Sequence, residues 1–484
     1  MTEPPASSTT ESPRARRIVV LGGGVCGLAV ALRMLEHEAG ADVVILERED
    51  RVGGLARRLT LGDQVADMGP HRIHTELPDV QAFLQDLAGR EMVRVPRQSQ
   101  MWLDGRWVEY PPKPMEMLRA WGPMRLAKAA ASFAAGKLRR AGAGQADSFE
   151  KVMTEAFGAE LYKLIVLGYT EKVWKTAPSQ IHGDIARVRV SAGGLDRIVK
   201  RVLVGEKEGQ ETALKKFYYI PGGVERLAEK LRERVLALGG RIETGQEVRD
   251  LERRGNGVWR VEASGATHEA DFVFSTLPVT DLLEWLLMRR PDSEVATARG
   301  GMRFIANFLV CLLVKKDRVT PNQWLYFPGP DTIFNRGYEP KNFHESMGAA
   351  GQSLLMLETT CLHGDATWGM SDEDLTEASI AGVEATGLLT RADIAETRVV
   401  RIPHTYPLYD LGYRERLERV WGYLREWPGL ISVGRQGLFL HNNMDHSIHM
   451  GFRAAEVAAV EAREAPERAF YDEVERFQAF RIVD

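Results

Sequence analysis

Three glycines near the N-terminus, Gly22, Gly24 and Gly27, have the G-x-G-x-x-G spacing of a phosphate-binding turn. In such a turn the first glycine permits a tight bend, the second lets the backbone approach a pyrophosphate, and the third lets a helix pack against a strand. The helix that follows directs unpaired N–H groups and a partial positive charge at the phosphates. Glu47 lies roughly 20 residues further on, where dinucleotide-binding folds place the acid that accepts the ribose hydroxyls. These four residues predict a bound dinucleotide.

The flanking sequence predicts the elements that must position these residues. Residues 16–21 are an apolar, β-branched run typical of a buried strand, and residues 28–40 have apolar positions at helical spacing and end in a glycine. Residues 41–50 form a second predicted strand with Glu47 near its end. A glycine-rich turn in an unrelated α/β unit is the alternative, but it does not account for the strand, the helix and the acid together.

A second glycine pair follows the acid, in the stretch REDRVGGLARR at residues 48–58. This stretch resembles the motif after the ribose-binding acid in flavoproteins of the glutathione-reductase-like class, in the branch that contains amine oxidases, phytoene desaturases and protoporphyrinogen oxidases. The resemblance implies that the cofactor is FAD and that Gly53 and Gly54 pass close to its pyrophosphate. Arg48 and Leu55 are expected to contact FAD from the same stretch.

The resemblance also implies a discontinuous FAD domain, to which the chain must return. Residues 217–252 contain a predicted helix and then a strand, where the backbone of Val248 would touch the adenine. Residues 429–462 contain a strand, a glycine loop and a helix whose first turn carries Asp445, beside the flavin. The implied fold class is α/β, with a glutathione-reductase-like, Rossmann-type FAD domain interleaved with an α+β substrate domain.

The predicted domain boundaries follow from these segments. The FAD-binding domain comprises residues 15–75, 217–290 and 405–470, and the substrate domain comprises residues 76–216 and 291–404. Residues 1–14 are predicted to be a disordered tail and residues 471–484 a C-terminal extension. Residues 304–314 are the longest apolar stretch, but a membrane-spanning helix needs about 20 residues. We therefore expect a buried strand there and no transmembrane segment.

Four further stretches resemble UDP-galactopyranose mutases, which are flavoenzymes of related fold. They are DMGPHRIHT at residues 67–75, GYTEKVW at 168–174, FNRGYEPKNF at 334–343 and GRQGLFLHNNMD at 434–445. The resemblance implies that FAD is contacted by Gly69, Gly434, Arg435 and Asp445. It places His71 and His74 beside the flavin ring as catalytic candidates, and it implies that Arg336 binds a diphosphate. Substrate contacts are expected from Tyr169, Trp174, Arg336, Tyr406 and His441.

The chain departs from the mutases in the last of these stretches. Two positions that hold substrate-binding tyrosines in the mutases hold Phe439 and His441 here, and phenylalanine cannot donate the hydrogen bond. The stretch YYIPGGVERLAEKL at residues 218–231 and the STLP turn at 275–278 look more like protoporphyrinogen oxidases and desaturases. The sequence therefore combines features of the oxidising enzymes, which are the protoporphyrinogen oxidases and desaturases, with features of the redox-neutral mutases.

Composition argues against several other classes of protein. The 484-residue chain has a formal net charge of −4 and lacks the basic footprint of a nucleic-acid-binding protein. Its three cysteines are widely spaced, so neither a disulfide framework nor a cysteine zinc site is expected, and a cytoplasmic location fits. His441, His446 and His449 lie close together, but FAD is expected at this helix start and no metal site is predicted. The basic stretch 115–140 fits a solvated helix face or contact with a membrane surface.

The function expected from these features is that of an FAD-dependent oxidoreductase, which is an oxidase, dehydrogenase or desaturase. It would transfer a hydride from a small-molecule substrate to flavin N5. A redox-neutral mutase, which acts on a nucleotide sugar through reduced flavin, is the alternative, and a flavin-binding scaffold without turnover is a third possibility. The sequence does not specify the substrate, its phosphorylation, the electron acceptor or the oligomeric state.

Overall fold

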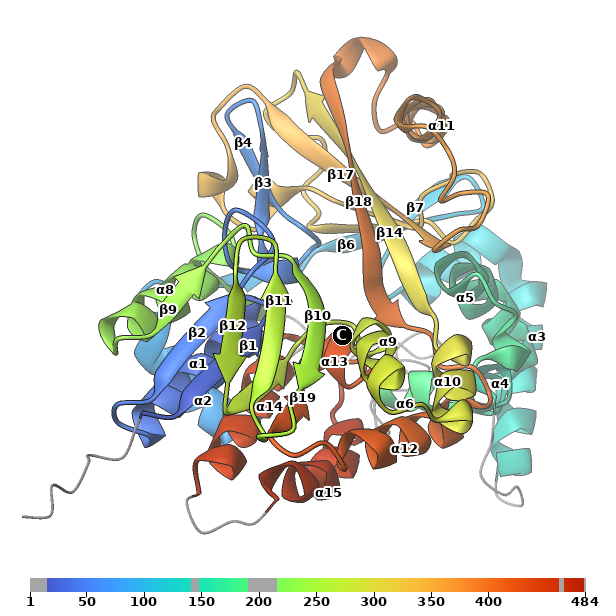
Figure 1. Ribbon diagram of the computed structural model, residues 1–484. Coiled ribbons are helices and arrows are strands. Elements are labelled where there is room, and N and C mark those ends of the chain that lie inside the picture. The colour runs from blue at the N-terminus through green and yellow to red at the C-terminus, as the bar shows by residue number, and fades with distance from the viewer. Residues whose placement is uncertain (1–14, 141–147, 190–215, 461–464, 483–484) are drawn as a thin grey trace, which may run out of the picture.

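The computed structural model describes residues 15–140, 148–189, 216–460 and 465–482. Two sheets organise these residues: a parallel sheet in the lower part of Figure 1 and a larger mixed sheet above it. The tail predicted at residues 1–14 lies outside the described residues.

The parallel sheet has five strands in the order β19-β13-β1-β2-β9, and all of its pairings are parallel. The strands are β1 (Arg17–Leu21), β2 (Asp42–Leu46), β9 (Arg241–Glu243), β13 (Phe272–Ser275) and β19 (Leu430–Ser432). Three distant segments of the chain therefore share one sheet. This confirms the two predicted returns and the α/β fold class.

Helices cover one face of the parallel sheet and a small antiparallel sheet covers the other (Figure 1). The helices are α1 (Val25–His37), α8 (Glu225–Ala237) and α14 (Met444–Ala459), and the small sheet comprises β10 (Val248–Arg253), β11 (Trp259–Ala263) and β12 (Thr267–Ala270). A Cβ at Gly451 of α14 would lie 2.8 Å from the carbonyl oxygen of Cys26, so α14 and α1 meet backbone to backbone. Helix α1 begins before the predicted residue 28, because the end of the glycine motif forms its first turn.

The mixed sheet has seven strands in the order β18-β14-β17-β16-β15-β6-β7. They are β6 (Ser99–Leu103), β7 (Arg106–Glu109), β14 (Phe304–Val314), β15 (Trp324–Tyr326), β16 (Arg336–Tyr338), β17 (Ser353–Leu362) and β18 (Ile394–Pro407). Every residue of β14 is buried, because the strand lies between β17 and β18 and contacts helix α11 (Asp372–Ala385). The strand predicted at residues 304–314 is confirmed.

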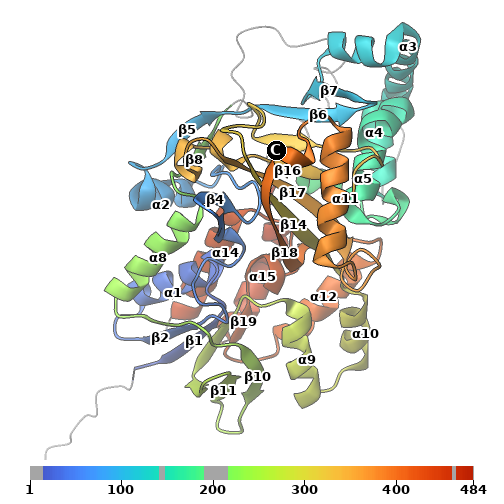
Figure 2. The same cartoon turned by 90° about the horizontal axis from the view of Figure 1, so that it is seen from above.

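Helices α3 (Pro114–Arg140), α4 (Phe149–Leu161) and α5 (Gly168–Trp174) stand together at one side of the mixed sheet in both views (Figures 1 and 2). The remaining helices are α2 (Pro78–Ala88), α6 (Asp184–Arg189), α9 (Val279–Arg289), α10 (Ser293–Gly301), α12 (Tyr413–Leu424), α13 (Gly434–Gly437) and α15 (Pro466–Gln478). The remaining strands are β3 (Arg58–Leu61), β4 (Gln64–Asp67), β5 (Val93–Pro96) and β8 (Lys216–Tyr219). Within the described residues, none of the helices has the length and apolar character needed to cross a membrane.

Three of the predicted domain boundaries fall inside elements. The boundary after residue 216 lies in β8, the one after 404 lies in β18 and the one after 470 lies in α15. Helix α15 packs against α14, and the Ser432 N–H donates to Tyr471 Oη at 3.0 Å. The start of the predicted C-terminal extension is therefore attached to the parallel sheet, while the division into two domains stays a prediction.

Candidate functional site

The glycine motif forms a tight turn between β1 and α1. Gly22 has a φ of +101°, which favours glycine, and its N–H donates to the Leu46 carbonyl oxygen at 2.8 Å. A Cβ at Gly27 would lie only 2.0 Å from the Gly22 carbonyl oxygen. The first and third glycines are thus needed for the bend and for the close packing of α1, as predicted.

The second glycine pair lies directly against this turn. The Gly53 N–H donates to the Gly23 carbonyl oxygen at 2.9 Å, and Gly54 has a φ of +56°. A Cβ at Gly54 would lie 3.1 Å from the Gly24 Cα, and Leu55 follows in a short 3₁₀ turn. The two glycine turns therefore form one surface of bare backbone at the N-terminus of α1, which fits a pyrophosphate.

Glu47 stands just after β2, beside the glycine turn. Its Oε2 accepts the Gly23 N–H at 2.8 Å and its Oε1 accepts the Glu49 N–H at 3.0 Å. Each carboxylate oxygen has a second lone pair for a ribose hydroxyl. The Gln246 N–H donates to the Glu47 carbonyl oxygen at 2.8 Å, which brings Val248 at the start of β10 to the same side. The Arg48 side chain, by contrast, is 62% exposed and pairs with Glu49.

Asp67, at the end of β4, anchors the loop that leads to His71 and His74. Its carboxylate accepts hydrogen bonds from Tyr219 Oη at 2.6 Å and from the Val224 N–H at 2.9 Å. Tyr338 Oη donates to the Asp67 carbonyl oxygen at 2.6 Å and accepts from the Gly69 N–H at 3.0 Å. Burial raises the pKa of Asp67 to about 7. The predicted motif contained Asp67, but nothing local in the sequence pointed to its buried partners.

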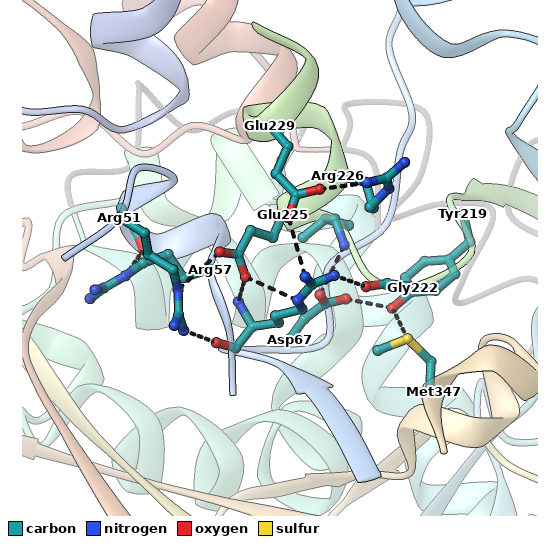
Figure 3. A network of polar contacts seen from close by, with 12 residues as sticks. Arg51, Arg57, Asp67, Tyr219, Gly222, Glu225, Arg226, Glu229 and Met347 are labelled. Carbon is teal, nitrogen blue, oxygen red and sulfur yellow. Dashed lines mark hydrogen bonds and ion pairs between the residues drawn. The ribbon is translucent and has the colours of Figure 1, made fainter. Parts of the chain in front are cut away.

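A second carboxylate beside Asp67 joins the start of α8 to the hairpin of β3 and β4. Glu225 Oε2 accepts the Arg58 N–H at 2.8 Å, and Arg51 Nε lies 3.0 Å from Glu225 Oε1. The Arg58 guanidinium also donates to the Gly222 carbonyl oxygen at 3.1 Å. Figure 3 shows these contacts around the turn between β8 and α8. They attach the turn before α8 to the β3–β4 hairpin, which leads to the loop with His71 and His74.

Several buried polar atoms between the Gly69–His74 loop and the start of α14 have no hydrogen-bond partner among the residues that the structure describes. They are His71 Nδ1, His74 Nε2, His441 Nδ1, Asn442 Nδ2 and Asp445 Oδ1. A narrow cavity is lined by His74, Met444 and Asp445, among others. Because buried polar atoms are normally hydrogen-bonded, these atoms leave hydrogen-bonding capacity for a bound polar ligand.

The same loop carries a neutral histidine. Burial, and then the positive charges of Arg435 and Arg336, lower the pKa of His71 to about 3. Burial also lowers the pKa of His74 and raises the pKa of Asp445. The catalytic roles of His71 and His74 stay predictions, but a neutral His71 is suited to hydrogen bonding rather than to proton donation.

Three predicted substrate residues form one aromatic cluster: Trp174, Tyr406 and His441. The Trp174 ring centroid lies 5.3 Å from that of His441 and 6.4 Å from that of Tyr406, and Tyr406 stacks on His441 at 5.9 Å. Tyr169 precedes Trp174 on α5, and its ring packs 5.8 Å from that of Tyr326. The cluster joins α5, β18 and the loop before α14, and its contact with substrate stays a prediction.

Three arginines surround Tyr406, and only one has a carboxylate partner among the described residues. Arg336 Nε lies 2.5 Å from Glu358 Oε2. Arg189 Cζ lies 4.7 Å and Arg435 Cζ lies 5.3 Å from the centroid of the Tyr406 ring. Burial raises the pKa of Tyr406, but the three guanidinium charges outweigh burial and lower it below its usual value.

The other two guanidinium groups contact only neutral groups in the described part of the chain. Arg435 donates to oxygens of Thr405 and Asn442. Arg189 stacks 5.2 Å from the Trp174 ring, and its buried Nε has no partner. Arg189 was not predicted from the sequence, because no motif surrounds it and only the fold of α6 brings it to Tyr406. The aromatic cluster thus lies in a positive field.

The closing segment places Phe439 and its histidines in separate surroundings. Phe439 is 1% exposed and packs 4.8 Å from the Phe304 ring. Its φ of +55° turns the chain, and the ring is buried in the core. His441 Nε2 lies 2.7 Å from the Pro407 carbonyl oxygen, His446 Nδ1 accepts the Asn443 N–H, and His449 pairs with Asp79. These histidines face separate partners.

Comparisons with known proteins agree with this geometry. A family model described as flavin containing amine oxidoreductase matches residues 25–378. Protoporphyrinogen oxidase 2 of Arabidopsis thaliana is 30% identical over 116 residues, which are 23% of this chain and 22% of that protein. The human peroxisomal N(1)-acetyl-spermine/spermidine oxidase is 37% identical over 67 residues, which are 14% of this chain and 13% of that protein. The matched stretches thus span less than a quarter of these relatives.

Two solved structures share the whole fold. Reduced UDP-galactopyranose mutase has a TM-score of 0.80 with 22% identity, over 97% of this chain and 99% of that one. A protein of the protoporphyrinogen oxidase type from Exiguobacterium sp. 255-15 has a TM-score of 0.73 with 16% identity, over 93% and 99%. The paired glycine turns, the Glu47 carboxylate beside them and the flavin-containing family model agree on FAD as the cofactor. The chain belongs to the flavin-containing amine oxidoreductase family.

Proposed function

We propose that the protein removes a hydride from a small-molecule substrate that carries an anionic group, and passes it to FAD. The observation that carries this proposal is Arg189, which lies against Trp174 and Tyr406 and has no carboxylate partner in the described ranges. A charged group that is partly withdrawn from water without a counter-ion is costly. A substrate carboxylate or phosphate would supply that counter-ion and a charge-assisted hydrogen bond.

FAD, when bound, supplies the hydride acceptor at N5 of its flavin. The chain's own residues supply position and charge. Arg189, Trp174, Tyr406 and Tyr169 would hold the substrate, and His71 would hydrogen-bond to the ring or the substrate through its unpaired Nδ1. The low pKa of His71 means that it does so without a change of protonation state.

The proposed FAD contacts are those of the two glycine turns, of Glu47 and of the closing loop. A Cβ at Gly434 would lie 3.0 Å from Cys26 Sγ at the start of α1, so the closing loop lies against the first glycine turn. Arg435 follows Gly434 and would place an uncompensated positive charge on the cofactor side of the aromatic cluster. Such a charge favours the reduced flavin, because its N1–C2=O region becomes negative.

The redox-neutral mutase remains the second candidate, because Arg336 lies beside the aromatic cluster as the mutase resemblance implies. Two observations favour the oxidoreductase over it. Arg336 is already ion-paired with Glu358, and Phe439 is buried in the core. The diphosphate clamp that the mutase resemblance implies is therefore incomplete.

Matched amines with and without a carboxylate test the proposal. Oxidised holoenzyme is titrated anaerobically with L-ornithine and putrescine, and with L-lysine and cadaverine, while the visible flavin spectrum is recorded. We expect the carboxylated member of each pair to perturb or bleach the flavin at lower concentration. Arg189→Met should remove that preference, whereas Arg187→Met, an equal charge change on the same helix, should keep it. Equal responses within each pair, unchanged by Arg189→Met, would refute the anionic substrate.

A further inference from the structure

A second pocket, of about 430 Å³, opens on the surface close to the aromatic cluster. Its walls come from the end of α5, the segment before β14 and the start of α12. The lining includes Lys175, Arg303, Asp410, Leu411, Gly412 and Arg416. Lys175 directly follows Trp174, but no ring of the aromatic cluster lines the pocket. Its volume is within the range of small-molecule sites, about 300–1,000 Å³.

The pocket has more positive than negative charge. Asp410 is the carboxylate that lines it; it pairs with Arg416 and accepts the Gly412 N–H at 3.1 Å. The Lys175 and Arg303 side chains have neither a hydrogen bond nor an ion pair within the ranges that the structure describes. Burial lowers the pKa of Lys175, and the Asp365 carboxylate offsets this effect only in part, so the ammonium group is partly dehydrated. Lys175 and Arg303 therefore give the pocket two positive charges that Asp410, paired with Arg416, does not contact.

The Arg416 side chain is tightly packed against two glycines, Gly301 and Gly412. A Cβ at Gly301 would lie 2.8 Å from Arg416 Cδ, and a Cβ at Gly412 would lie 3.0 Å from Arg416 Nη1. The two glycines let the Arg416 side chain lie flat between α10 and α12, where it holds the Asp410 carboxylate. Asp410 is thereby prevented from neutralising the other two cations.

Lys175 has a backbone conformation that lysine rarely adopts. Its φ of +51° and ψ of +27° are left-handed, at the position after a helix where glycine is usual. Non-glycine residues in this region cost free energy and concentrate at functional sites. The position therefore carries a backbone cost that glycine would avoid.

We propose that this pocket is a second anion-binding site, which takes the phosphate or diphosphate group of a small molecule between Lys175 and Arg303. The planar guanidinium suits two-point contact with phosphate oxygens, and the ammonium adds a point charge. Leu411, which is 41% exposed, offers an apolar wall to the rest of the ligand. The site is independent of the proposed function, because none of its lining residues belongs to the aromatic cluster or to the FAD contacts.

Pyrophosphate is the probe for this site, and its binding to the FAD-loaded protein is measured by calorimetry. We expect one binding event whose affinity falls as salt rises, because charge pairs at a surface are screened. Arg303→Gln should weaken binding at least tenfold. Lys175→Gly should weaken it as strongly while the melting temperature stays the same or rises, because glycine relaxes the left-handed backbone. This variant separates a loss of binding from a loss of folding.

Two controls decide where the pyrophosphate binds. The double variant Lys315→Gln/Arg391→Gln removes one lysine and one arginine elsewhere on the surface and should leave binding unchanged. Arg189→Met should also leave it unchanged. Loss of binding in Arg189→Met with retention in Arg303→Gln would place the pyrophosphate at the aromatic cluster and overturn the proposal. Absence of binding to the wild-type protein at millimolar pyrophosphate would overturn it as well.

Discussion

Replacing Asp67 with asparagine should change how the stability of the protein depends on pH. Burial raises the pKa of Asp67 from 3.8 to about 7, so the folded state keeps a proton that the unfolded chain has already lost. The resulting stabilisation is complete below about pH 4, declines as the pH rises, and is lost above about pH 7. At about 1.4 kcal/mol per pKa unit, this difference corresponds to about 4 kcal/mol.

Asparagine has nearly the same shape as aspartate, keeps an oxygen for the Val224 N–H, and cannot ionise. Wild type should lose about 4 kcal/mol of unfolding free energy between about pH 4 and pH 7 that Asp67→Asn does not lose. Relative to wild type, the variant therefore becomes more stable as the pH rises. Thermal unfolding at a series of pH values measures this shift. Asp63→Asn, in the exposed turn of the same hairpin, is the control and should leave the pH dependence unchanged. A stability difference that stays constant with pH would refute the perturbed pKa of Asp67.

Three further predictions concern the cofactor, the substrate and the scaffold. Glu47→Ala should weaken FAD binding at least tenfold in a titration of the apoprotein, because hydrogen bonds to a charged group contribute about 1.5–3 kcal/mol each; unchanged affinity would place the ribose elsewhere. Arg336→Lys replaces the two-point guanidinium contact with a single ammonium group, so it should raise KM if Arg336 binds substrate. Normal kinetics with a lower melting temperature would assign Arg336 a structural role with Glu358. Lys172→Met should lower the melting temperature, because the carbonyls of Phe327 and Gly329 and the Thr332 hydroxyl lose their shared donor; an unchanged melting temperature would contradict this.

The predictable parts of the fold are those formed by residues that are close together in the sequence. The glycine turn, its strand and its helix lie within one short stretch, and each leaves a pattern of spacing that a single sequence displays. Strand β14 was predictable because it is buried on both faces and therefore reads as an uninterrupted apolar run. The predicted start of α1 is too late, because Val25, Cys26 and Gly27 at the end of the glycine motif already belong to the helix.

The parts that were not predictable depend on contacts between distant residues. Tyr219 donates to Asp67 across 152 positions of sequence, and neither residue has a neighbour that signals the pair. Arg189 acquires its importance only because α6 brings it to Tyr406 on β18. Arg336 was predicted near the substrate, but its ion pair with Glu358 on the neighbouring strand arises from strand register, which no short motif displays.

The most direct test of the central claim is an anaerobic single-turnover experiment with the oxidised FAD enzyme and the matched amine pairs. The absorbance of oxidised flavin and the amount of oxidised product are measured together. We predict that a carboxylated substrate bleaches the flavin and that product forms in equal amount to the bleached flavin. A flavin that stays oxidised with every substrate, in a protein that interconverts UDP-galactopyranose only after chemical reduction, would contradict hydride removal and establish the redox-neutral alternative.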